Sequence, residues 1–303
     1  MIGIICWFMR ITEKMKLIVI FRRINYLLID LKITGIINNA FGLIITKRQL
    51  KNSPTQEMID SREFFSKNNN RVNNVLSLLA DEKSKTTFLD MIDFRCNRHL
   101  RFSEEINNSN HHFIPDISDI FEFQNDEVFI DCGAYCGDTI HSFKKYMKRH
   151  RKSYKKIVAF EPNIKWYRVL IHDHPDVIAF NSGVWSESTT LMFSGNLMLT
   201  QADSIKDDES VISIPVISID SCQECENATF IKMDIEGAEL NALIGAKKII
   251  FKNKPKLAIC IYHSNEEMLS IIEWLHKEFP QYKLYVRQLQ KYSINETVLY
   301  ATI

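Results

Sequence analysis

The chain has 303 residues, of which 46% are hydrophobic and 25% charged, and its formal net charge is +1. This composition is that of an ordinary globular protein. The near-neutral charge argues against a nucleic-acid-binding protein, which would carry a strong basic excess. No apolar run reaches the roughly 20 residues that a membrane-spanning helix needs, and no secretory leader pattern is present. We therefore expect a cytoplasmic protein.

Residues 1–124 are predicted to form a helical N-terminal region. Within residues 14–34, apolar side chains recur at steps of three and four, which is typical of an amphipathic helix. Its basic residues are Lys14, Lys16, Arg22, Arg23 and Lys32. Two interpretations stay open: the helix packs into the protein's own helical region, or it associates peripherally with an anionic membrane at its inner face. The sequence does not indicate an oligomeric state.

Two further helices are predicted before the main domain. The pair Ser53-Pro54 is a good helix start, because a hydroxyl can cap the first turn and proline fits it. Another helix is expected from Asp81 to about His99. Between them, the polar stretch 66–74 (SKNNNRVNN) is predicted to be a loop.

From Glu127 onward, short apolar runs alternate with helical stretches, so residues 125–303 are predicted to form an α/β domain. This alternation is typical of a mostly parallel sheet with helices on both faces. Buried strands are expected at 128–131, 156–161, 177–182, 229–234 and 256–263, and helices from near Asp138, Asn163, Ala238 and Asn265. The interval 184–215 is interpreted as a hairpin insertion. Residues 282–288 and 296–303 are predicted to form an antiparallel hairpin that ends the sheet.

The stretch VFIDCGAYCGDTIHSF has the pattern strand, glycine turn, helix. Ligands of parallel sheets bind at the carboxyl ends of the strands. A dinucleotide site would have a glycine where Tyr135 stands, so that the backbone could approach a pyrophosphate. The acid at Asp131 also disfavours a phosphate, because the two charges would repel. The turn therefore favours a ligand without phosphates.

A second acid, Glu161, ends the next predicted strand, where a carboxylate can accept hydrogen bonds from ribose hydroxyls. An adenosine without phosphates and with a positive centre describes S-adenosylmethionine (SAM). The alternative is that Asp131 and Glu161 only cap helices. The predicted cofactor-binding residues are Asp131, Gly133, Tyr135, Gly137, Asp138, Thr139, Glu161, Asn181 and Ser182.

The stretch FIKMDIEGAELNALIGA places several carboxylates where a strand gives way to a helix. Asp234 and Glu236 are candidates for contact with an acceptor, while Glu239 is favoured as a helix cap or ion-pair partner. His263 follows the next strand, where a histidine is predicted to titrate near its reference pKa of about 6.5 and can act as a base. The alternative is a structural histidine that caps the helix after it. The candidate catalytic residues are Asp234, Glu236, His263 and Lys232. No metal is expected, although two carboxylates and water could hold Mg²⁺.

Three motifs resemble the FkbM-type family of SAM-dependent methyltransferases. DCGAYCGDT resembles its first cofactor motif, FEPN its second, and KMDIEGAELNALIGA its most diagnostic signature. The resemblance extends from about Val72 to the C-terminus. It implies a Rossmann-like class I methyltransferase fold and SAM as the cofactor. It also implies methyl transfer to a hydroxyl of a sugar or glycan precursor, in surface polysaccharide biosynthesis.

Two functions other than methyl transfer stay open. One is a non-catalytic protein that keeps the fold and serves as a binding or scaffold component of a glycan-assembly complex. The other is a nicotinamide-dependent oxidoreductase, which Tyr135 in the glycine turn disfavours.

Overall fold

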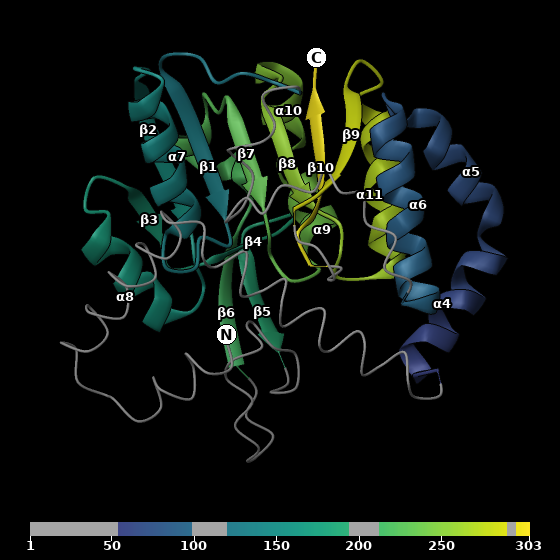
Figure 1. The fold of residues 1–303 in the computed structure, drawn as a ribbon. Helices are drawn as coiled ribbons and strands as arrows, with labels where there is room; N and C mark the ends of the chain where they lie inside the picture. Colours follow the sequence, from purple (N-terminus) through teal and green to yellow (C-terminus); the bar gives the residue numbers. More distant parts are fainter. Residues whose placement is uncertain (1–53, 99–119, 194–211, 290–294) are drawn as a thin grey trace.

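The computed structural model describes residues 54–98, 120–193, 212–289 and 295–303. Their centre is a seven-stranded sheet with the order β3-β2-β1-β7-β8-β10-β9 (Figure 1). The strands are β1 (Glu127–Cys132), β2 (Tyr154–Phe160), β3 (Ile178–Phe180), β7 (Phe230–Met233), β8 (Lys256–Cys260), β9 (Lys283–Gln288) and β10 (Thr297–Thr302). The predicted helix over residues 14–34 lies outside the described residues.

The central strands are apolar at successive positions because both faces of the sheet are covered. On β1, Phe129 packs into one hydrophobic cluster and its neighbour Ile130 into the other. β1 pairs in parallel with β2 on one side and with β7 on the other, and β7 pairs in parallel with β8. The carboxyl ends of these four strands therefore meet at one edge of the sheet.

The two last strands confirm the predicted antiparallel hairpin. β10 runs antiparallel to both β8 and β9 and lies between them. The chain thus inserts its last strand next to β8 rather than adding it outside β9. The α/β class and the mostly parallel sheet predicted from the sequence are confirmed.

Helices cover both faces, as the alternating pattern predicted. They are α7 (Asp138–Arg149), α8 (Ile164–Asp173), α9 (Glu239–Ile244), α10 (Lys247–Asn253) and α11 (Asn265–Glu278). Ile140 and Phe143 of α7 belong to one cluster, while Leu269 and Ile272 of α11 belong to the other. The hydroxyl of Ser264 caps α11 by accepting from the backbone N–H of Glu267.

The N-terminal helices are α4 (Gln56–Lys67), α5 (Asn69–Leu78) and α6 (Glu82–Asn97). They lie beside the β9 edge and α11 in Figure 1, and α6 contacts β9 while α5 contacts α11. The cap of α4 is Thr55 rather than Ser53, and the predicted helix from Asp81 is confirmed, with the Asp81 side chain as its cap. The division of the chain at residues 124 and 125 stays a prediction.

The prediction of a loop over residues 66–74 is wrong. The chain is helical there except for a break at Asn68, whose amide side chain donates to the carbonyl of Phe64. Val72 and Val75 of α5 are buried three residues apart. Arg71 binds the carboxylates of Glu266 and Glu273 on α11, at 2.8 and 2.7 Å. Tertiary packing thus outweighs the weak helix propensity of the asparagines.

The predicted hairpin insertion is also present, with one additional strand. β5 (Thr189–Phe193) and β6 (Ile212–Ile217) are antiparallel, and β4 (Gly183–Val184) joins them in a small sheet of order β4-β6-β5. The segment after β6 is fixed to the main domain by Asp220, whose backbone N–H donates to the carbonyl of Gly245. Within the described part of the chain, no helix has the length and hydrophobicity needed to cross a membrane.

Candidate active site

The glycine turn after β1 lies at the carboxyl edge of the sheet. Gly133 and Gly137 have φ angles of +77° and +87°, which favour glycine. A Cβ atom on Gly133 would lie 1.9 Å from the backbone oxygen of Asp234, so this glycine lets the ends of β1 and β7 approach each other. At Gly137, a Cβ atom would lie 2.5 Å from the ring of His174. Both glycines are therefore required by packing as well as by backbone conformation.

Tyr135 lies in the same turn with a φ of +49°, which is unusual for a residue with a side chain. Its backbone N–H donates to Glu161 at 2.8 Å, and its ring packs against Trp166 with ring centroids 4.1 Å apart. The second oxygen of Glu161 accepts from the backbone N–H of Asn163, also at 2.8 Å. Strained backbone of this kind is often found at ligand sites.

Glu161 is the acid at the end of β2, and only 6% of it is exposed. Burial raises the pKa of its carboxyl to about 7, although the backbone N–H groups of Asn163 and Tyr135 oppose the shift. Each carboxylate oxygen accepts one backbone hydrogen bond and has a second lone pair left for a ligand hydroxyl.

Two polar residues follow β3 at the same edge of the sheet as Glu161. The amide of Asn181 donates to the carbonyls of Glu161 and Pro162, at 2.9 Å each. The hydroxyl of Ser182 is buried and has no hydrogen-bond partner within the described residues. An orphaned hydroxyl at the same edge of the sheet as a buried acid and two aromatic rings fits a ligand such as adenosine, which offers hydroxyls, ring nitrogens and an aromatic face.

Asp138 and Thr139 begin α7, as predicted. Thr139 is buried, and its backbone N–H donates to the Asp138 carboxylate at 2.9 Å. Asp138 therefore occupies the first turn of the helix, where the helix dipole favours a carboxylate.

Asp131 and Lys232 form a buried ion pair rather than reaching into open space. They are opposite each other on β1 and β7, and Lys232 Nζ lies 3.0 Å from Asp131 Oδ1. The side chains are 0% and 3% exposed, for Asp131 and Lys232 respectively. Lys232 also donates to the carbonyl of Gly133 at 2.8 Å. Burial opposes the charge, but Asp131 and then Asp234 raise the pKa of Lys232 well above its usual range.

A second cluster joins the ends of β7 and β8. His263 Nε2 lies 3.2 Å from Asp234 Oδ1 and 3.1 Å from Glu239 Oε1. The hydroxyl of Tyr262 donates to Asp234 Oδ1 at 2.9 Å. Because β7 and β8 are neighbours, the sequence-predicted residues Asp234 and His263 come together although they lie 29 positions apart in the sequence.

Glu239 is fully buried at the start of α9. Its two oxygens accept from the backbone N–H groups of Ile235 and Gly237, at 2.7 and 3.0 Å. It therefore caps the turn, and it also pairs with His263. Both interpretations favoured from the sequence describe this carboxylate.

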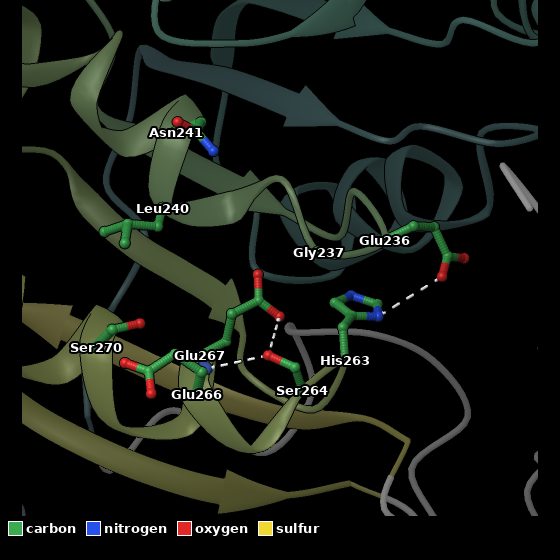
Figure 2. Close-up of a pocket in the computed structure, with 9 residues that line it drawn as sticks. All are labelled: Glu236, Gly237, Leu240, Asn241, His263, Ser264, Glu266, Glu267 and Ser270. Carbon is green, nitrogen blue, oxygen red and sulfur yellow. Dashed lines mark hydrogen bonds and ion pairs between the residues drawn. The ribbon is translucent and has the colours of Figure 1, made fainter. Parts of the chain in front are cut away.

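Glu236 occupies the turn itself and, like Tyr135, has a left-handed backbone, with a φ of +58°. Its carboxylate lies 3.6 Å from His263 Nδ1. Figure 2 shows the two side chains facing each other. Burial raises the pKa of Glu236, while His263 opposes the shift. The two residues border an open pocket of about 350 Å³, whose further lining is Gly237, Leu240, Asn241, Ser264, Glu266, Glu267 and Ser270.

The surroundings of His263 do not match a histidine that titrates near 6.5. Burial of the imidazole opposes protonation, but the carboxylates of Asp234 and Glu239 outweigh it and raise the pKa of His263 to about 11. The expected titration near neutral pH is therefore wrong. The sequence showed that His263 lies at this edge, but not that carboxylates lie on both sides of its ring.

Two aromatic residues beside the predicted ones were not found from the sequence. Trp166 packs against Tyr135, and Tyr262 donates to Asp234. Trp166 lies three residues after the cap of α8, and Tyr262 immediately precedes His263, so proximity to the predicted residues was the only available signal.

The seven-stranded sheet with its inserted last strand, together with the glycine turn after β1, defines a class I methyltransferase fold, which belongs to SAM-dependent enzymes. The chain belongs to the FkbM methyltransferase family: the family described as "Methyltransferase FkbM domain" matches residues 131–285. Membership of this family identifies SAM as the cofactor. The carboxylate of Glu161 and the buried hydroxyl of Ser182, which is unpartnered within the described part of the chain, fit the hydroxyls and ring nitrogens of its adenosine.

Several solved structures are similar to this chain. Methyltransferase FkbM from Methylobacillus flagellatus KT is 22% identical, with a TM-score of 0.63, and the similarity covers 79% of this chain and 60% of that chain. Fibrillarin from Aeropyrum pernix, solved with SAM, is 10% identical over 59% of this chain and 67% of its own, with a TM-score of 0.35. A SAM-dependent methyltransferase from Aquifex aeolicus is 11% identical, with a TM-score of 0.32. The similarity covers 62% of this chain and 87% of that chain. No curated protein matches the chain.

SAM binding is expected to strengthen as the pH rises through about 7, the pKa of Glu161. The folded-state pKa lies above the ordinary value of 4.5, so the carboxyl is neutral below pH 7 and ionised above it. A ribose hydroxyl bonds more strongly to the ionised form, by about fivefold to tenfold in affinity. Calorimetric titration of SAM between pH 6 and 8 measures this change.

The control for this experiment is Glu161→Gln, whose side chain cannot ionise. Its SAM affinity is expected to be lower than that of the wild type at pH 8 and nearly independent of pH. Any pH dependence that comes from SAM itself will persist in the variant. Equal pH dependence in both proteins would show that Glu161 does not bind the cofactor.

Proposed function

We propose that this protein transfers the methyl group of SAM to a hydroxyl oxygen of a sugar or glycan precursor, as a cytoplasmic step of surface polysaccharide biosynthesis. The observation that carries the proposal is the pocket lined by Glu236 and His263. Six of its nine lining residues have carboxylate, amide or hydroxyl side chains, and these groups complement the hydroxyl groups of a sugar.

The carboxylate cluster supplies what methyl transfer to an alcohol requires from the protein. SAM, when bound, supplies an electrophilic methyl group on a sulfonium. The acceptor hydroxyl must lose its proton, and Asp234 at the carboxyl edge of the sheet is the candidate to take it. Glu161 and Ser182 would hold the adenosine side of the cofactor. The ion pair of Asp131 and Lys232 stabilises the glycine turn, since Lys232 donates a hydrogen bond to the carbonyl of Gly133.

Mass spectrometry of surface glycans from cells with and without the gene tests this proposal. Loss of one methyl group from a sugar, restored when the gene is returned, is the expected result. A calorimetric titration with SAM accompanies it. If the protein binds SAM but the glycans of both strains carry the same methyl groups, the non-catalytic scaffold function would be favoured instead.

A further inference from the structure

Three potential metal ligands converge at the carboxyl ends of β7 and β8. They are Asp234, Glu239 and His263, and one ligand atom from each lies within 4.8 Å of the others. The distances from His263 Nε2 to the two carboxylate oxygens are 3.2 and 3.1 Å. Two atoms bound about 2.1 Å from one metal ion at a right angle are about 3.0 Å apart. The distance from His263 Nε2 to each carboxylate oxygen is therefore close to that between neighbouring ligands of one ion, and the third distance lies below 4.8 Å.

The imidazole of His263 gives an independent indication of a ligand. Its side chain is only 9% exposed, and Nε2 is buried. Nε2 lies at ion-pair distance from two carboxylate oxygens, but neither contact has the geometry of a hydrogen bond, and no other described residue bonds to it. A buried nitrogen that faces two carboxylates without a well-aligned hydrogen bond is unusual for a structural histidine. It is the arrangement that a shared cation would produce.

The surrounding groups hold the three side chains in place. Tyr262 donates to Asp234 Oδ1, and the backbone N–H of Ile235 donates to Glu239 Oε1. The other ring nitrogen of His263 faces the carboxylate of Glu236 at 3.6 Å. Metal ligands are typically oriented by an outer layer of this kind, with a carboxylate behind the histidine.

We propose that Asp234, Glu239 and His263 bind one divalent first-row transition metal ion, with Mn²⁺ or Zn²⁺ preferred over Mg²⁺ and Ca²⁺. Imidazole nitrogen suits the transition ions, whereas Mg²⁺ and Ca²⁺ take oxygen ligands. Three protein ligands leave coordination positions open for water or a substrate oxygen.

A metal ion here would bring the acceptor to the cofactor, a role that rests on the proposed function. A hydroxyl bound to a divalent ion loses its proton more easily, and its oxygen is held in a fixed position. Metal binding itself does not depend on the acceptor, so it can be measured without SAM and without any sugar.

The test is a calorimetric titration of the chelator-treated full-length protein with MnCl₂, repeated with MgCl₂. Saturable binding of one Mn²⁺ per chain, at least about tenfold tighter than Mg²⁺, is expected. His263→Ala and Asp234→Asn should each weaken Mn²⁺ binding by more than about tenfold. Tyr262→Phe, which keeps all three ligands, should weaken it by about tenfold or more through loss of orientation.

Two matched variants complete the experiment. His276→Ala, on the exposed side of α11, and Asp60→Asn, on the exposed side of α4, should bind Mn²⁺ like the wild type. If Mn²⁺ does not bind, or binds equally to the wild type and to His263→Ala, the proposal is overturned. The cluster would then be held by a proton on His263. That result would leave the proposed methyl transfer intact, because glycan methylation is measured separately.

Discussion

Replacing Asp234 by asparagine is expected to lower methyl-transfer turnover about 10²- to 10⁴-fold, the range typical for loss of a general base. Asparagine keeps the size of the side chain but cannot take a proton from the acceptor hydroxyl. SAM affinity should change little, because the Asp234 side chain contacts Tyr262 and His263, which lie outside the glycine turn. Single-turnover rates and calorimetric SAM binding separate the two effects.

In the proposed reaction, a carboxylate is useful where it faces the acceptor and not where it touches the methyl group. SAM would supply a positively charged sulfur, and this charge would be lost on methyl transfer. A carboxylate in contact with the sulfur would stabilise the ground state more than the transition state. A carboxylate that faces the acceptor avoids this cost.

Asp60→Asn is the matched control for this experiment, because Asp60 is an exposed carboxylate of α4 that accepts from Gln56 of its own helix. It should turn over like the wild type. Wild-type turnover in Asp234→Asn would mean that the cluster at the end of β7 is structural. A parallel loss of SAM binding would instead mean that the substitution disturbs the contact between Gly133 and the Asp234 backbone.

Some parts of the fold could be predicted from the sequence. In these parts, the local pattern of apolar residues agrees with the burial of the side chains in the structure. The strands β1, β2, β7 and β8 are buried on both faces, so their apolar runs are nearly continuous and easy to find. The glycine turn could be located because Gly133 and Gly137 adopt a backbone conformation that few other residues tolerate. The acids that end the strands could be placed at one edge of the sheet, because the carboxyl ends of parallel strands meet there.

The remaining features depend on contacts between distant segments. The asparagine-rich stretch 66–74 is helical because Val72 is buried and Arg71 binds α11. No local propensity reports such contacts. The raised pKa of His263 likewise comes from carboxylates on another strand and helix, which the sequence places 24 and 29 residues away.

Lys232 illustrates the same limit for a charged residue. Its place beside three carboxylates in the sequence favoured a catalytic role. In the sheet, however, its side chain is directed toward Asp131 on the neighbouring strand and toward the carbonyl of Gly133. Alternation along β7 decides this direction, since successive side chains point to opposite faces. The structure therefore favours a structural role for Lys232, and stability measurements can distinguish the two.

Replacing Lys232 by methionine is expected to lower the free energy of unfolding by about 3–5 kcal/mol. Methionine fills a similar volume but leaves the Asp131 carboxylate buried without its cation, and it removes the hydrogen bond to Gly133. Urea unfolding followed by circular dichroism measures the loss. SAM binding should weaken as well, because the glycine turn loses its support.

The double variant Asp131→Asn/Lys232→Met should recover part of the lost stability, since neither buried charge remains. Lys247→Met is the matched control: this lysine is half-exposed and pairs with Glu278 at 2.5 Å, so its loss should cost no more than about 1 kcal/mol. A Lys232→Met protein that is as stable as the wild type and binds SAM normally, yet does not transfer a methyl group, would contradict the structural role. Lys232 would then have to act on the acceptor, and the ion pair with Asp131 would have to open during the reaction.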